Sequence, residues 1–255
     1  MILRVIAIYT TAFLLGGIGL FFASRKQPVH VRHVRHVRLV KFVTYFCIVN
    51  LVLFAALAGH WIFTTLVVAI VCLGARELFG VVVAAAGGSR IKAGAIVIAY
   101  LLVGSAAVAF AWFSASKSAI FVFLIVCSFD GFSQVTGQLL GKHQFAPAIS
   151  PGKTIEGSLG GLLFAIGMAF ALRALIETPV FPTVLASCFI VLAALTGDLL
   201  ASLVKRKSGV KDFSNLLPGH GGILDRFDSF LFAAAACFAV GLAGQMLMRN
   251  VNLPR

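Results

Sequence analysis

The chain has 255 residues, of which 60 % are hydrophobic and only 11 % are charged, and its formal net charge is +13. About a quarter of the residues in soluble globular domains are charged, so this composition excludes an ordinary soluble domain and indicates a protein whose solvent is lipid. The informative count is therefore the number of apolar runs near the roughly 20 residues that a helix needs to cross a bilayer.

Eight apolar runs of this length follow one another along the chain. They cover residues 2–23, 39–58, 61–79, 93–113, 119–140, 158–176, 183–204 and 229–248. The expected fold is all-α, a polytopic membrane bundle of about eight transmembrane helices. A ninth span is the alternative, because residues 81–86 either extend the third helix or lie in the membrane interface. The first run lacks a small-residue cleavage site and precedes a basic block, which favours a retained span over a cleaved signal.

The lysines and arginines divide unevenly between the two ends of these predicted helices. With both termini on one side, five of the 21 fall on that side and 16 fall on the other. The positive-inside rule then predicts that the loops at 24–41, 142–157 and 205–226 are cytoplasmic. Cations concentrated on one face suit anionic lipid headgroups and nucleotides.

The first of these loops ends in a threefold His-Val-Arg repeat at positions 30–38. Metal binding by its histidines is one reading, but the interleaved arginines would repel a cation. We expect a basic segment that lies on anionic lipid, where each charge contributes about 1 kcal/mol.

Acidic residues are rare, so their positions are informative. The eight are Glu77, Asp130, Glu156, Glu177, Asp198, Asp212, Asp225 and Asp228. Asp130 and Asp198 lie within or near the end of apolar helices, where an ionised carboxylate is costly unless it faces a partner or a wet cavity. Such carboxylates are functional candidates. Glu77 lies near the cytoplasmic end of the third helix, where it either belongs to the site or pairs with its neighbour Arg76.

The stretch from Asp198 to Asp228 combines carboxylates, cations and glycines. Asp198, Ser202 and Lys205 are spaced i, i+4 and i+7, so they share one helix face. The next segment is a loop with a Gly-His-Gly-Gly run at 219–222, whose backbone N–H groups can approach an anion closely. Asp225 and Asp228 then open the last helix. Five cations accompany them, namely Lys205, Arg206, Lys207, Lys211 and Arg226.

This combination predicts a site for a metal and a polyphosphate together. The alternative is that the charges only anchor helix ends at the headgroups, as most juxtamembrane charges do. Anchoring requires neither acidic residues among the bases nor the glycine run, so we favour the site.

The segment from Ser202 to Asp228 resembles the signature of the phosphatidate cytidylyltransferase (CDP-diacylglycerol synthase) family. A second match is Ser-Pro-Gly-Lys-Thr-Ile-Glu-Gly at 150–157, and a third, weaker one covers 130–142. The resemblance covers about the C-terminal half. It suggests two regions: 1–118, transmembrane helices with the basic loop 24–41, and 119–255, the catalytic transmembrane region.

The resemblance implies a nucleotidyltransferase of phospholipid biosynthesis that converts CTP and phosphatidate into CDP-diacylglycerol and pyrophosphate. It implies Mg²⁺ as cofactor, with a second cation such as K⁺ sharing the site, and makes Asp198, Asp225 and Asp228 the expected metal ligands. The residues expected to cradle phosphates in catalysis are Lys205, Arg206, Lys211, His220 and Arg226. The expected substrate-binding residues are Ser150, Lys153, Thr154, Glu156, Ser202, Gly221, Gly222 and Asp130.

The expected location is a bacterial-type inner or plasma membrane, with the active site on the cytoplasmic side. The expected partners are the two substrates and the bilayer, without nucleic acid. Gly157 and Gly161 form a Gly-x-x-x-Gly pair, which indicates close helix packing, either within the chain or in a homodimer.

Three other functions stay open at this point. They are a CTP-dependent lipid kinase, a cytidylyltransferase that acts on another lipid phosphate, and a membrane transporter. A transporter would be expected to carry repeat symmetry and mid-membrane charges, and neither is evident. The segment after Asp130 departs from the family by carrying Gln134 and Gln138, which leaves the exact lipid acceptor open.

Overall fold

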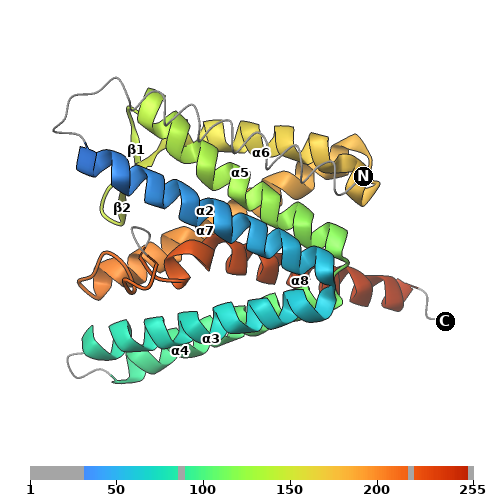
Figure 1. The fold of residues 1–255 in the computed structure, drawn as a ribbon. Coiled ribbons are helices and arrows are strands. Elements are labelled where there is room, and N and C mark those ends of the chain that lie inside the picture. Colours follow the sequence, from blue (N-terminus) through green and yellow to red (C-terminus); the bar gives the residue numbers. More distant parts are fainter. Residues whose placement is uncertain (1–31, 86–89, 218–220, 252–255) are drawn as a thin grey trace.

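The computed structural model describes residues 32–85, 90–217 and 221–251, and these fold almost entirely into helices (Figure 1). The helices are α2 (Arg32–Ala58), α3 (His60–Ala85), α4 (Arg90–Phe113), α5 (Ser116–Leu140), α6 (Ile155–Ile176), α7 (Val180–Lys207) and α8 (Leu224–Val251). The expectation of a helical membrane bundle is therefore confirmed in its main feature.

Six of the described helices, α3 to α8, are long and apolar enough to cross a membrane. Large side chains such as Leu163 and Phe181 point outward, as expected of helices whose backbone groups are satisfied internally and whose surface meets lipid. We conclude that the chain is an integral membrane protein. The predicted total of eight spans stays a prediction, because the run at 2–23 lies outside the described residues and the apolar part of α2, Val43–Ala58, is shorter than a span.

At two helix boundaries the structure adds information to the predicted apolar runs. Residues 81–85 continue α3, which decides between the two readings of that segment in favour of a longer third helix. α2 begins at Arg32, so the backbone is already helical within the His-Val-Arg repeat.

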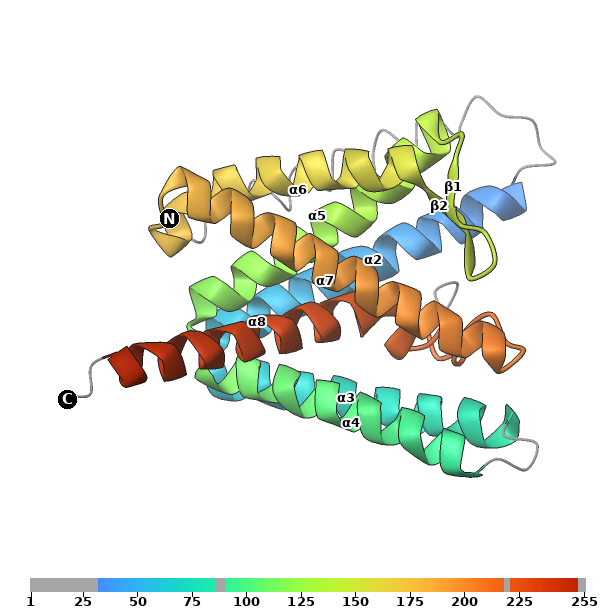
Figure 2. The ribbon, with the colours of Figure 1, turned by 180° about the vertical axis from the view of Figure 1, so that it is seen from behind.

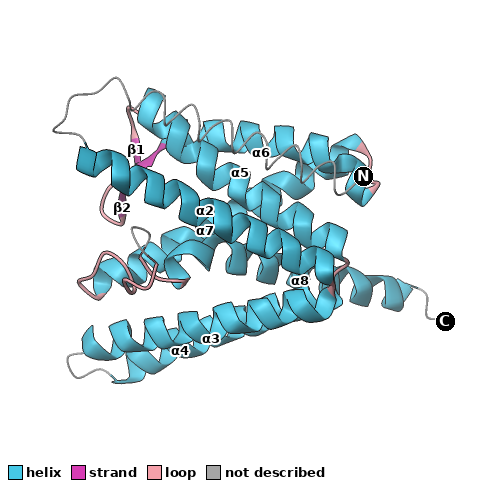
Figure 3. Cartoon of the chain, in the orientation of Figure 1, coloured by secondary structure: helices cyan, strands magenta, loops and turns pink. Residues whose placement is uncertain are grey.

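A small β-hairpin lies between α5 and α6, and the all-α prediction omitted it (Figure 3). Strand β1 (Gln144–Ala146) pairs antiparallel with β2 (Ser150–Thr154), and the Ile149 N–H donates to the Ala146 carbonyl across the turn. Thr154 ends the hairpin and caps α6, since its hydroxyl accepts a hydrogen bond from the Gly157 N–H at 3.1 Å.

The helices run alternately up and down, and this brings distant segments to one end of the bundle (Figures 1 and 2). The hairpin, the α7–α8 loop and the C-terminal end of α3 all lie there. The two predicted cytoplasmic loops at 142–157 and 205–226 thus share one end of the molecule.

α5 and α6 pack closely enough to require glycine at two contacts. A Cβ at Gly157 would lie 2.7 Å from the Ser133 carbonyl oxygen, and one at Gly161 would lie 2.7 Å from that of Phe129. The Gly-x-x-x-Gly pair therefore faces α5 within the chain, which confirms the prediction of close helix packing. This contact fixes the hairpin, which connects the same two helices, against the end of the bundle.

Candidate active site

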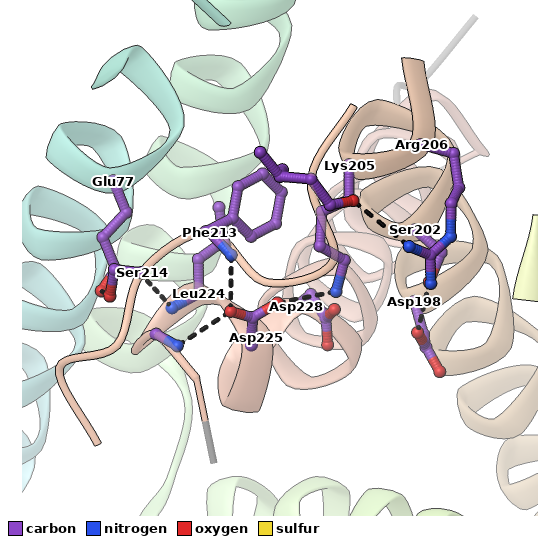
Figure 4. Close-up of polar contacts among 12 residues, drawn as sticks. Glu77, Asp198, Ser202, Lys205, Arg206, Phe213, Ser214, Leu224, Asp225 and Asp228 are labelled. Carbon is purple, nitrogen blue, oxygen red and sulfur yellow. Dashed lines mark hydrogen bonds and ion pairs between the residues drawn. The ribbon is translucent and has the colours of Figure 1, made fainter. Parts of the chain in front are cut away.

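The last turns of α7 carry the first group of predicted site residues. The Ser202 hydroxyl donates to Oδ1 of Asp198 at 3.3 Å, so the predicted shared face of the helix is confirmed. One turn further, Lys205 is buried and extends toward the start of α8. Figure 4 shows Asp228 between the Asp198 carboxylate and the Asp225 carboxylate, with Lys205 beside them.

Asp225 joins the end of α7 to the start of α8 through three polar contacts. Its Oδ1 lies 2.7 Å from Nζ of Lys205, and its Oδ2 accepts 2.8 Å hydrogen bonds from the N–H groups of Phe213 and Gly222 (Figure 4). The ammonium group also lies 5.3 Å from the centroid of the Phe213 ring. A buried ion pair needs such additional hydrogen bonds to offset the loss of hydration.

The α7–α8 loop folds back on itself around this carboxylate. The Leu217 N–H donates to the Gly221 carbonyl at 2.8 Å. Gly221 has a φ of +82°, and a Cβ there would lie 2.9 Å from Oδ2 of Asp225. The glycine is thus required both by the backbone conformation and by the close approach to the carboxylate.

Glu77 reaches the same loop from α3. Its carboxylate accepts hydrogen bonds from the Ser214 hydroxyl at 2.6 Å, the Ile223 N–H at 3.0 Å and the Leu224 N–H at 2.9 Å. Of the two alternatives for Glu77, the structure therefore supports a place beside the site. Its partners could not be found from sequence spacing, because two of them are backbone groups about 145 positions away along the chain.

The β-hairpin brings the second sequence motif to the end of α7. Lys153 on β2 forms an ion pair with Asp198, and Nε of Arg206 donates to the Ile149 carbonyl at 3.2 Å. Two motifs that are separate in sequence, 150–157 and 202–228, therefore meet in one site.

Glu156, predicted to bind substrate, makes hydrogen bonds at the base of the hairpin in this structure. Its carboxylate accepts hydrogen bonds from the N–H groups of Lys142 and His143, and lies 2.5 Å from Nδ1 of His143. These contacts lock the end of α5 to the start of α6. A role in substrate binding stays a prediction for Glu156.

The carboxylates of Asp130, Asp198 and Asp228 lie close enough to interact electrostatically with one another. Mutually repelling carboxylates form a donor set suited to a divalent cation, and Mg²⁺ commonly takes only one or two protein carboxylates with waters and substrate phosphates completing its shell. Among the residues that the structure describes, no three His, Cys, Asp or Glu side chains form a ready metal cage. The chemistry of Asp198 and Asp228 is compatible with Mg²⁺, and their role as metal ligands stays a prediction.

Three further predicted residues come from the end of α7, the α7–α8 loop and the first turn of α8. Arg206, Lys211 and Arg226 are exposed at the same end of the bundle, although the Arg206 guanidinium also donates to the Ile149 and Val210 carbonyls. His220 lies outside the described residues. The metal and phosphate roles of all these residues stay predictions.

The part of the chain that matches a known protein family contains most of these residues. The model of the cytidylyltransferase family matches residues 89–243, which include the hairpin, α7, the loop and most of α8. Glu77 lies outside the matched region.

The chain is also similar to bacterial proteins named phosphatidate cytidylyltransferase. It is 46 % identical to the Staphylococcus epidermidis protein over 115 residues, which is 44 % of each chain. It is 45 % identical to the Bacillus subtilis protein over 111 residues, 43 % of this chain and 41 % of the relative. Identity to the Staphylococcus haemolyticus protein is 38 % over 142 residues, 53 % of each chain. The matches thus span about half the length of these curated relatives.

Proposed function

Because the chain belongs to the cytidylyltransferase family, we propose that it is a phosphatidate cytidylyltransferase, which transfers CMP from CTP to phosphatidate and releases pyrophosphate. The observation that carries the proposal is the meeting of the Lys153 hairpin with the Asp198 and Lys205 face of α7. That junction combines carboxylates with cations at the end of a membrane bundle, where a lipid headgroup and a nucleotide can both arrive.

The proposed reaction is an attack by a phosphate oxygen of phosphatidate on the α-phosphorus of CTP. A new P–O bond forms at that phosphorus, and its bond to the oxygen bridging to the β-phosphorus breaks, so that pyrophosphate leaves with the bonding pair. The nucleophile is already an anion, so no general base is needed. The protein must bring two polyanions together and stabilise the charge on the leaving group.

Cations of the chain suit this task in different ways. Arg206, Lys211 and Arg226 are exposed and would bind phosphate oxygens directly. Lys153 is ion-paired with Asp198 and would exchange that contact for a phosphate as substrate enters. Lys205, buried against Asp225, is the most buried of these cations and would hold the positive potential at the inner wall of the site.

The proposed cofactor is Mg²⁺, for which Asp198 and Asp228 are the residues that fit best. Bound there, the cation would neutralise phosphate charge and polarise the bond to the leaving group. Asp225 would support the site indirectly by holding Lys205 and the loop in place, because its oxygens already accept hydrogen bonds from Lys205 and two backbone N–H groups.

The proposed setting is the cytoplasmic face of a bacterial-type plasma membrane. The excess of lysine and arginine at the end that holds the site supports this orientation. CTP would arrive from the cytosol, and phosphatidate would enter laterally from the bilayer.

A label-transfer experiment tests the reaction. Purified protein in detergent is incubated with phosphatidate, Mg²⁺ and CTP that is labelled at either the α or the γ phosphate. We expect label in the lipid only from the α position, with release of one pyrophosphate per lipid product.

The other outcomes identify the alternatives. Label from the γ position would make the protein a lipid kinase and overturn the proposal. No label from either position with phosphatidate, but α label in another lipid phosphate, would replace the acceptor. The Asp198→Asn variant serves as the control for a contaminating enzyme, since the transfer rate of its preparation should be at least about 100-fold lower.

A further inference from the structure

We propose that Glu77 is a positioning residue for the catalytic segment, and that it acts by holding the first turn of α8 in place from a different helix. The kinetic part of this inference rests on the proposed cytidylyl transfer, whereas its structural part does not. Glu77 is supplied by α3, outside the region that the family model matches. Its three hydrogen bonds all go to the segment that leads into α8.

The physical basis is the unsatisfied start of a helix. The first N–H groups of a helix have no partner within it, and a carboxylate near them is stabilised by these donors and by the helix dipole. In this protein three consecutive N–H groups are bound by two carboxylates. Gly222 donates to Asp225, while Ile223 and Leu224 donate to Glu77.

Asp225 and Glu77 therefore cap the same helix start, one from within α8 and one from α3 (Figure 4). This turn and the residue after it carry Arg226 and Asp228, which are proposed to act on phosphate and metal. Asp225 lies in the first turn of α8 and Asp228 directly follows it. A change in the angle of that turn would therefore shift both carboxylates in the same direction. Glu77 thus controls how these groups face α7.

The packing around Glu77 explains a glycine of the signature. A Cβ at Gly222 would lie 2.5 Å from Oε2, 2.7 Å from Cδ and 2.8 Å from Oε1 of Glu77. A methyl group therefore cannot be added at Gly222 while Glu77 keeps its position. Glycine at position 222 therefore leaves the space that the Glu77 carboxylate occupies, whether or not substrate also comes close to this residue.

Variants at Glu77 test the positioning role by kinetics. Glu77→Ala removes all three acceptors, and Glu77→Gln keeps one acceptor oxygen of similar reach. Hydrogen bonds to a charged group are among the stronger ones in proteins, so we expect kcat to fall at least about 10-fold in Glu77→Ala, with partial rescue in Glu77→Gln. The KM for CTP should change less than kcat. The matched control is Glu177→Gln, an exposed glutamate at the other end of the bundle, which should keep wild-type kinetics.

All rates are expressed per folded protein, measured as the monodisperse fraction in size-exclusion chromatography. A purely structural role would reduce the yield of that fraction and leave its kcat unchanged, which would overturn the positioning role. Because Glu77→Ala can fail to fold, Glu77→Gln is the variant on which the decision rests.

Hydrogen–deuterium exchange supplies a measurement that does not depend on activity. Glu77→Gln should exchange faster than wild type in residues 211–227 and equally in α5 and α6. Unchanged exchange in that segment would overturn the anchoring itself. If the wild-type protein transferred no label from CTP, the proposed function would fail while this exchange result still decided the role of Glu77.

Discussion

The ammonium group of Lys205 and the carboxylate of Asp225 form an ion pair, with 2.7 Å between Nζ and Oδ1, and their side chains are 11 % and 1 % exposed. Asp225 gains two backbone hydrogen bonds in addition, whereas Lys205 makes no second close ion pair and lies near the Phe213 ring and the more distant Asp228 carboxylate. The pair joins the end of α7 to the start of α8. Loss of the partner should therefore destabilise the protein more when Lys205 is the residue left behind than when Asp225 is.

This inequality leads to a prediction about stability. Removing one partner of a buried ion pair typically costs about 3–5 kcal/mol, because the other charge is left unpaired. Asp225→Asn should cost more than Lys205→Met, since it removes the ion-pair partner of a buried cation and weakens the hydrogen bonds that hold the loop. The double variant should be less destabilised than the sum of the two single variants. Thermal unfolding in detergent, followed by circular dichroism or an intrinsic fluorophore, provides the comparison.

Lys117→Met is the matched control for this series. Lys117 pairs with Glu177 at 3.4 Å, but the two side chains are 46 % and 78 % exposed. Exposed pairs contribute about 0–1 kcal/mol, so the control should barely move the midpoint. Additive effects of Lys205→Met and Asp225→Asn would mean that the buried pair has no coupling energy and that the interpretation of its geometry is wrong.

The helices and the main motif could be predicted from the sequence because both are local signals. The apolar runs predicted the ends of α3 to α8 to within six residues, and the i, i+4, i+7 spacing correctly placed Asp198, Ser202 and Lys205 on one face. Hydropathy underestimates the length of the helices, however, because charged residues at their ends interrupt the apolar runs. The start of α8 at Leu224 includes Asp225 and Asp228, whose charges ended the apolar run at 229.

The hairpin and the role of Glu77 could not be predicted, for different reasons. β1 and β2 have three and five residues, contain Pro151 and Gly152, and alternate too little to give a strand signal. The partners of Glu77 are set by how α3 packs beside α8, and no local pattern encodes a contact to a distant backbone N–H. Tertiary packing decides both features.

A second prediction concerns the proposed metal ligands. Asp198→Asn and Asp228→Asn should each lower kcat at least about 100-fold, because each removes a charge that is needed to hold the cation at the reacting phosphates. Their levels in the membrane should stay near wild type, since neither side chain is fully buried. Mg²⁺ titration of the residual activity should also require a higher concentration for half-saturation.

Asp212→Asn is the comparison variant, because Asp212 is an exposed loop carboxylate and should affect activity less. Lys153→Met adds a directional check. It frees Asp198 from its ion pair, so half-saturation with Mg²⁺ should occur at a lower concentration even though kcat falls. Wild-type magnesium dependence in Asp198→Asn would rule out this residue as a ligand.

The third prediction is the orientation of the bundle in the membrane, on which access to a cytosolic nucleotide depends. Asn215 is exposed on the α7–α8 loop, and Glu177 is exposed between α6 and α7 at the opposite end. In a background with all five cysteines replaced, Asn215→Cys and Glu177→Cys each supply one accessible thiol. An impermeant maleimide should label Glu177→Cys in intact cells and Asn215→Cys only after lysis, because the excess of lysine and arginine keeps the loop end in the cytoplasm. Labelling of Asn215→Cys in intact cells would place the candidate site outside, where CTP is not supplied, and would remove the basis for the proposed reaction.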